Sequence, residues 1–156
     1  MLGAATGGAE LDAPSGTVVC ATEPGVDTYA PNLKKPGTSG SYSFELVSST
    51  PAPPALDDNT FVVRVTGADG TPQNGQLTAI LDMPEHGHTS PKTPVITFDA
   101  NAGAFTLNPM YLFMVGLWRI TLTFQADAAD GTMASVAGAS GVEGGTDSVV
   151  FEFCVN

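Results

Sequence analysis

Basic residues are scarce in this chain of 156 residues: lysine and arginine number 5 against 16 aspartates and glutamates, for a net charge of -11. Such a surface repels phosphate backbones and anionic lipid headgroups, which argues against nucleic-acid and membrane-surface partners. The same negative field weakly favours cations.

Long apolar runs are also missing. No run of apolar residues approaches the length of about 18 that a membrane-spanning helix needs. The first 15 residues have neither the basic start nor the apolar stretch of a signal peptide. We therefore expect no membrane span, a flexible lead-in over residues 1–15 and a single domain over residues 16–156. A Gly/Ala-rich lead-in is typical of the segment after a processing site or a lipidated cysteine, which favours a secreted or lipid-anchored protein.

Helical periodicity is not evident, and alternation with a period of two dominates instead. It is clearest in LWRITLTFQ, where Trp118, Ile120, Leu122 and Phe124 share one face. Similar runs predict strands over residues 17–21, 41–47, 60–67, 76–83, 94–99, 103–109 and 148–155. Turn signals separate these runs, so the sequence predicts an all-β fold, an immunoglobulin-like antiparallel β-sandwich of 7–9 strands.

Two connections lack strand character. Residues 49–59, STPAPPALDDN, are too rich in proline for a helix or a central strand, and we expect an extended crossover there. Residues 126–147 consist mostly of small side chains that cannot build a core, which predicts a mobile loop between the last two strands.

Cysteine is limited to Cys20 and Cys154, with no Cys-x-x-Cys spacing or neighbouring histidine to indicate a zinc or redox site. Two alternatives remain: two buried free thiols, or one disulfide that ties the two ends of the domain together. A disulfide would imply the periplasm, the cell surface or the exterior.

Signatures of common enzymes are missing as well. The sequence has no Gly-x-Ser-x-Gly elbow, no phosphate-binding glycine loop with its lysine, and no pair of carboxylates that stands out as acid and base. We expect a protein that is not an enzyme.

The two histidines, His86 and His88, lie in the single segment LDMPEHGHTSP, with Met83 upstream and Gly87 between them. Imidazole suits copper, zinc, nickel or iron, and thioether sulfur selects copper, especially Cu(I). In an extended geometry both imidazoles project to the same side, and Gly87 lets the backbone curl.

A second methionine-containing segment, NPMYLFMVGLW, leads into the strongest predicted strand. Met110 or Met114 could approach the histidine turn across the end of the sandwich and complete a copper site. Simpler interpretations stay open: the turn can lack a metal, and methionines before a strand, Met110 above all, are often core residues. Asp82 and Glu85 can be solvated charges or acceptors that orient the imidazoles.

The two segments together resemble a known family. The order VTGADGTPQNGQLTAILDMPEHGH, then PVITFDANAGAFTLNPMYLFMVGLWRITLTF, is similar to the YtkA-like/FixH-like family of bacterial envelope proteins. The shared features are a strand ending in Met-Pro-x-His-Gly-His, a glycine-containing hairpin, and Phe-Met-x-Gly-x-Trp before a long strand. The resemblance covers roughly residues 59–125.

The resemblance implies an immunoglobulin-like sandwich outside the cytoplasm and a link to copper handling and to the assembly of copper-containing oxidases. Met83, His86, His88 and Met114 fall on motif positions, whereas Met110 does not.

We therefore predict a monomer of the periplasm or cell surface that binds one copper ion, Cu(I) or Cu(II), through His86, His88 and one or both of Met83 and Met114. It would capture copper or deliver it to another envelope protein. The alternative is a non-catalytic structural or interaction module without a metal, in which MPEHGH only packs against FMVGLW. An adhesion or carbohydrate-binding domain is a third possibility, and it requires exposed aromatic side chains.

Overall fold

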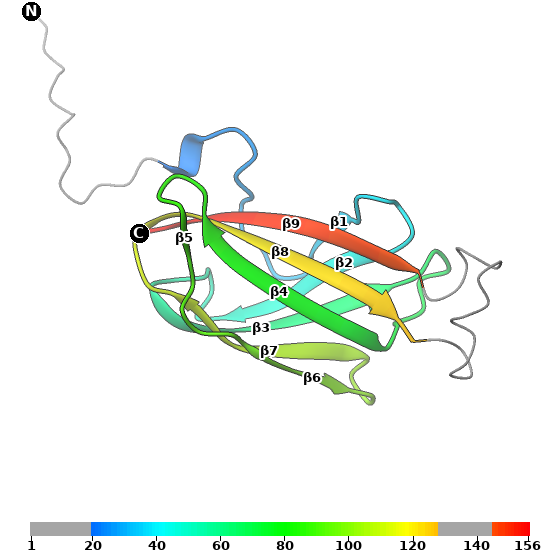
Figure 1. Cartoon of the computed structure of the whole chain (residues 1–156). Coiled ribbons are helices and arrows are strands. Elements are labelled where there is room, and N and C mark those ends of the chain that lie inside the picture. The colour runs from blue at the N-terminus through cyan, green and yellow to red at the C-terminus, as the bar shows by residue number, and fades with distance from the viewer. Residues whose placement is uncertain (1–19, 128–144) are drawn as a thin grey trace, which may run out of the picture.

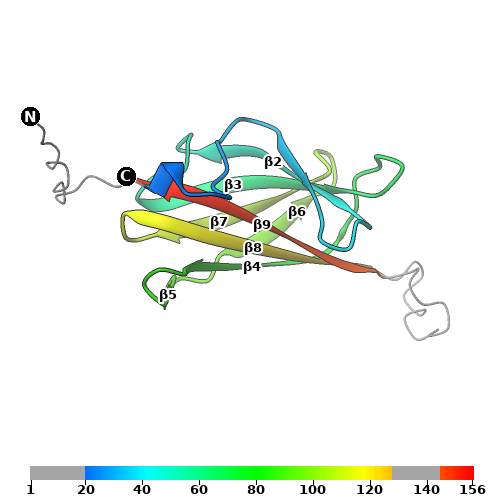
Figure 2. The same cartoon turned by 90° about the horizontal axis from the view of Figure 1, so that it is seen from above.

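The chain folds as two antiparallel β-sheets that face each other (Figure 1, Figure 2). The computed structural model describes residues 20–127 and 145–156. Within these ranges the strands are β1 (Leu33–Pro36), β2 (Ser43–Thr50), β3 (Asp57–Thr66), β4 (Gly75–Met83), β5 (His88–Thr89), β6 (Val95–Asp99), β7 (Ala104–Leu112), β8 (Gly116–Ala126) and β9 (Thr146–Val155). One sheet has the order β1-β2-β3-β7-β6 and the other β5-β4-β8-β9. The predicted immunoglobulin-like sandwich of 7–9 strands is confirmed.

Strand β8 is the central strand of the four-stranded sheet, paired with β4 on one side and β9 on the other. Its predicted inner face is confirmed, because Trp118, Ile120, Leu122 and Phe124 have no exposed surface. Burying a side chain of this size stabilises the fold by about 1.5–3 kcal/mol.

The five-stranded sheet supplies the other half of the core. Alternate residues of β2 and β3 are buried, and so is Leu107 of β7. These side chains are Phe44, Leu46, Phe61, Val63 and Val65. Strands β1 and β5 were not anticipated, because LKKP and HT are too short to show alternation.

The first predicted strand, residues 17–21, is wrong where the structure describes it. Cys20 begins a short 3-10 helix, η2 (Cys20–Thr22), in which the Glu23 amide donates to the Cys20 carbonyl at 3.0 Å. Pro24 follows directly and cannot continue a sheet ladder.

The crossover predicted for residues 49–59 is also wrong, since β2 and β3 are antiparallel neighbours and their connection is a hairpin loop. The buried Asn59 amide holds this loop: its oxygen accepts from the Ala55 amide at 2.9 Å, and its nitrogen donates to the Ala55 carbonyl at 2.8 Å. The same nitrogen donates to the Met110 carbonyl at 3.1 Å.

Two further expectations lie largely outside the described residues. The lead-in at 1–15 is outside them, and so is the 128–144 part of the predicted loop. The strands reach into that loop at both ends, because β8 includes Ala126 and β9 begins at Thr146. Across the described part of the chain, no helix is long and apolar enough to cross a membrane.

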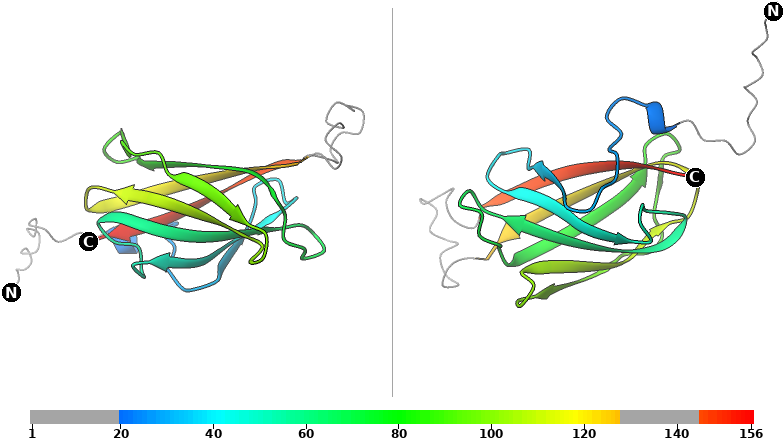
Figure 3. Two further views of the ribbon diagram at one scale, coloured as in Figure 1. Left: turned by 90° about the horizontal axis from the view of Figure 1, so that it is seen from below. Right: turned by 180° about the vertical axis from the view of Figure 1, so that it is seen from behind.

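Cys20 and Cys154 form a disulfide with a Cα–Cα distance of 5.5 Å, which decides between the two alternatives for the cysteines. The bond ties η2 to β9 across a sequence separation of 134 residues. Figure 3 shows η2 and the C-terminus at the same end of the sandwich.

Asp147, at the start of β9, holds the hairpin between β1 and β2. Its Oδ1 accepts from the amides of Ser39 and Ser148, and its Oδ2 accepts from those of Ser41 and Tyr42, all within 3.0 Å. Burial raises the pKa of this carboxyl, but the hydrogen bonds from Ser39, Tyr42 and Ser148 outweigh it, so the pKa lies below its ordinary value of 3.8.

Replacing Asp147 by asparagine should lower the free energy of unfolding at pH 7 by about 1–3 kcal/mol, because the amide NH2 would face backbone donors. The depressed folded-state pKa adds stability above the unfolded value of 3.8, and this is lost as the pH falls through the folded pKa. Urea unfolding at pH 7 and near pH 3 should therefore show the difference from wild type shrinking in acid.

The control for this prediction is Asp69→Asn. Asp69 is solvent-exposed and bonds within its own turn, where it accepts from the Thr71 amide at 2.9 Å. Its replacement should change stability little. Equal losses for both variants would contradict the role assigned to Asp147.

Reducing the disulfide should also destabilise the fold. In the chain-entropy model, closing a loop of this length contributes about 4–5 kcal/mol. Unfolding of the wild type with and without reductant measures this, and the Cys20→Ser/Cys154→Ser variant should not respond to reductant. Two titratable thiols in the native protein would contradict the bond.

Candidate metal centre

The histidine segment is a tight turn between β4 and β5. The amides of His86 and Gly87 both donate to the Met83 carbonyl, at 3.0 and 2.9 Å. Gly87 has a φ of 69°, so the predicted curl at this glycine is confirmed. His86 therefore lies within the turn and His88 begins β5, so the two histidines do not lie along one extended strand.

Both imidazoles are exposed and close together. The ring centres of His86 and His88 are 5.7 Å apart, and the ring planes differ by 24°. His88 is the first residue of β5, where it pairs with Met83 of β4. Met83 itself has no exposed surface and belongs to the hydrophobic core. Its sulfur is therefore buried, whereas the nitrogens of the two imidazoles are on exposed side chains.

The FMVGLW segment, which links β7 to β8, meets this turn at the same end of the sandwich. The rings of Phe113 and His88 have centres 6.1 Å apart, and those of Phe113 and Trp118 5.5 Å. A β-carbon built on Gly116 would lie 2.8 Å from Met83 Cε and 3.9 Å from His86 Nε2. The two motifs seen in the sequence are therefore neighbours in space.

The remaining methionines occupy different positions. Met114, which follows Phe113 and comes two residues before Gly116 in the sequence, is half-buried. Its carbonyl accepts a hydrogen bond from Trp118 Nε1 at 2.8 Å. Met110 is fully buried on the inner face of β7, which confirms its interpretation as a core residue.

Of the two acidic residues beside the turn, Asp82 has another partner. Its Oδ2 lies 2.9 Å from an Arg119 nitrogen, and this hydrogen bond and the carboxylate charge raise the pKa of the guanidinium. Asp82 therefore pairs across to β8, which does not support its interpretation as an acceptor for the imidazoles.

Within residues 20–127 and 145–156, no three His, Cys, Asp or Glu side chains are grouped as a metal cluster. The donors that the turn does gather are two imidazoles and the Met83 thioether. The roles of Phe113 and Gly116 were not recognised in the sequence, although both belong to the Phe-Met-x-Gly-x-Trp motif.

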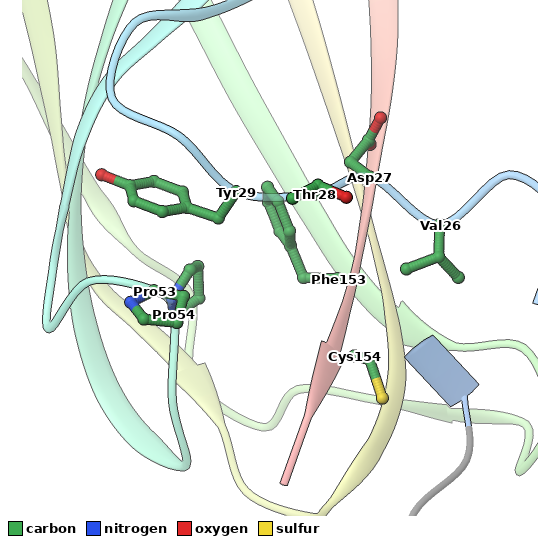
Figure 4. A pocket seen from close by; sticks show the side chains of 8 residues that line it. All are labelled: Val26, Asp27, Thr28, Tyr29, Pro53, Pro54, Phe153 and Cys154. Atoms are coloured by element: carbon green, nitrogen blue, oxygen red, sulfur yellow. The ribbon is translucent and has the colours of Figure 1, made fainter. Parts of the chain in front are cut away.

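A hollow of about 180 Å³ is lined in part by Phe153 and Cys154 of β9 (Figure 4). Tyr29, Pro53, Pro54 and Phe153 give it mostly apolar walls. The Asp27 carboxylate at its edge is already engaged by Lys35 Nζ at 2.9 Å and by the Glu152 amide at 2.8 Å.

Exposed aromatic residues would be needed for the adhesion interpretation. In the described part of the chain the exposed large hydrophobic residues are aliphatic: Leu56, Ile80, Val95 and Val115.

The geometry is that of an immunoglobulin-like sandwich with a Met/His turn at one end. The chain belongs to the YtkA-like family, whose model matches residues 37–123. No curated protein matches it. Among solved structures it is similar to a copper-bound variant of FetP from uropathogenic Escherichia coli strain F11, at 13% identity over 83% of this chain and 89% of that chain. The TM-score is 0.38, too low to transfer a function.

The burial of the methionines predicts their order of oxidation. Peroxide should oxidise the half-buried Met114 before Met83 and Met110, which have no exposed surface. Peptide mass mapping over time measures this. Oxidation of Met83 as fast as that of Met114 would mean that the turn opens in solution.

Proposed function

We propose that this protein binds one copper ion at the end of the sandwich and serves in copper capture or delivery in the bacterial envelope, without catalysing a reaction. His86 and His88 supply nitrogen, and Met83 supplies sulfur. Met114, two residues before Gly116, is a further candidate for a sulfur ligand.

The observation that carries the proposal is that the side chains of Met83 and His86 approach the same glycine. Met83 Cε and His86 Nε2 lie 2.8 and 3.9 Å from the position that a β-carbon on Gly116 would take. Cε is the methyl carbon bonded to the Met83 sulfur, so a thioether side chain and an imidazole nitrogen border the same small space, and together they are a donor set that suits copper.

The spacing of the two imidazoles also fits one ion. Imidazole nitrogens bind first-row metals at about 2 Å, so two rings that share an ion have centres about 5–6 Å apart. The separation of 5.7 Å between His86 and His88 lies in this range.

The oxidation states would differ in their ligands. Cu(I) is soft and favours the thioether, whereas Cu(II) favours nitrogen and oxygen ligands in a tetragonal arrangement. The buried sulfur and exposed imidazoles therefore support binding of both states, with Met83 contributing mainly to Cu(I).

The compartment is part of the same proposal. The Cys20–Cys154 disulfide is typical of an oxidising environment, which favours the periplasm, the cell surface or the exterior. A secreted or lipid-anchored monomer that passes copper to another envelope protein is consistent with a site on exposed turns at one end of the domain.

The competing function is a structural or interaction module without a metal. Two observations favour it: Met83 is part of the hydrophobic core, and the ring of His88 packs near that of Phe113. In that case the turn would serve only to close the end of the sandwich.

Metal titration separates the two functions. Calorimetry with Cu(II), and competition with a chromogenic chelator for Cu(I), should give submicromolar dissociation constants for the wild type. The His86→Ala/His88→Ala variant should lose binding of both ions. No binding by the wild type, or unchanged binding by the double variant, contradicts the copper function.

A matched pair of methionine variants sharpens this test. Met83 and Met110 are both fully buried, so Met83→Leu and Met110→Leu should each cost less than about 1.5 kcal/mol of stability. Only Met83→Leu should weaken Cu(I) binding, by about tenfold or more, since only Met83 lies at the turn.

A further inference from the structure

Gly116, the first residue of β8, has a backbone conformation that suits only glycine. Its φ is 133°, a region in which a residue with a β-carbon is strained. It pairs with Val155 of β9, so its position is fixed by the sheet.

The space beside Gly116 is occupied by the two candidate ligands. A β-carbon there would lie 2.8 Å from Met83 Cε, closer than real β-carbons come to other atoms, and 3.9 Å from His86 Nε2. Gly40, Gly70 and Gly87 also have positive φ, but a β-carbon on any of them would have nothing within 4 Å. Gly116 therefore differs from these three glycines, because side-chain atoms of other residues lie close to its α-carbon.

We propose that Gly116 is a specificity-determining residue of the metal site: its missing side chain leaves room for the end of the Met83 side chain beside His86, which lets the thioether join the imidazoles as a ligand and raises the affinity for Cu(I) relative to Cu(II). The inference rests on the proposed copper function and assigns the sulfur ligand to Met83. Gly116 acts through the position of Met83 and does not itself bind the ion.

The effect should be specific for the soft ion. A methyl group at position 116 would force Met83 Cε, the end of a flexible side chain, to move. Because Met83 is enclosed by the densely packed core, this movement shifts the thioether away from the side of the turn where His86 lies. His86 and His88 stand on the exposed side of the turn and keep their nitrogens available. Cu(I) binding therefore weakens when the sulfur is displaced, whereas binding of Cu(II) through nitrogen persists.

The test compares wild type, Gly116→Ala, Met83→Leu and the double variant by Cu(I) competition and Cu(II) calorimetry. Gly116→Ala should weaken Cu(I) binding by about 10–100-fold, the usual cost of disturbing a residue that positions a ligand, and change Cu(II) binding by no more than about threefold. In the Met83→Leu background, Gly116→Ala should cause no further loss of Cu(I) affinity, because the sulfur that it displaces is already gone.

The control is Gly70→Ala, which also imposes a positive φ, 84°, on an L-residue but at a position with open space. It should leave both copper affinities unchanged, and thermal unfolding should establish that each variant is folded.

The results distinguish this inference from the proposed function. Wild-type protein that binds no copper refutes the copper function. Copper binding that needs the histidines but is unaffected by Gly116→Ala refutes only the role of Gly116. Equal losses of Cu(I) and Cu(II) in folded Gly116→Ala, or additive effects with Met83→Leu, refute it as well.

If Gly116→Ala does not fold, X-ray absorption of the Cu(I) form tests whether Met83 supplies the sulfur ligand, on which the role of Gly116 depends. The wild type should show a copper–sulfur distance that disappears in Met83→Leu and persists in Met114→Leu. The opposite pattern overturns the assignment of the sulfur to Met83.

Discussion

The register between β4 and β8 is the constraint on which the candidate site depends. Eight consecutive pairs, from Gly75 opposite Ala126 to Asp82 opposite Arg119, align the two strands without a bulge. This register places Met83, the next residue of β4, against the beginning of β8, where Gly116 lies. A slip of one residue would turn Met83 to the outer face and bring the Asp82 carboxylate into the core, which the cost of burying a charge forbids.

The same end of the sandwich is held by several independent interactions. The disulfide joins η2 to Cys154, which pairs with Leu117 of β8, one residue after Gly116. The rings of Phe113 and Trp118 pack edge to face beneath the turn. These interactions give the turn a stable base on one side while the imidazoles stay open on the other. This arrangement suits the proposed copper function, because the buried Met83 would be positioned in advance and the exposed histidines would be accessible to a partner.

The strands, their faces and the association of two motifs were largely predictable. The alternation of Trp118, Ile120, Leu122 and Phe124 is a local property, and it gave the correct inner face of β8. The failures occurred where contacts distant in sequence contribute to the conformation. Cys20 lies in a 3-10 helix at the disulfide instead of a strand. The proline-rich segment after β2 is held as a hairpin loop by the Asn59 side chain, which also bonds the Met110 carbonyl 51 residues away. The structural role of Asp147 could not be predicted from the sequence, because three of its four amide donors belong to a hairpin more than 100 residues away.

The sequence by itself determined the class of fold, the family and the candidate donors His86, His88 and Met83. Periodicity, motif order and the chemistry of potential ligands depend only on which residues follow one another along the chain. Only the tertiary structure decided that the cysteines form a bond, that Asp82 pairs with Arg119, and that the side chains of Met83 and His86 both approach Gly116. The physical reason is that these contacts join β4, β8, β9 and the two connecting turns. Their geometry follows from strand register and side-chain burial, which a residue pattern within one segment does not contain.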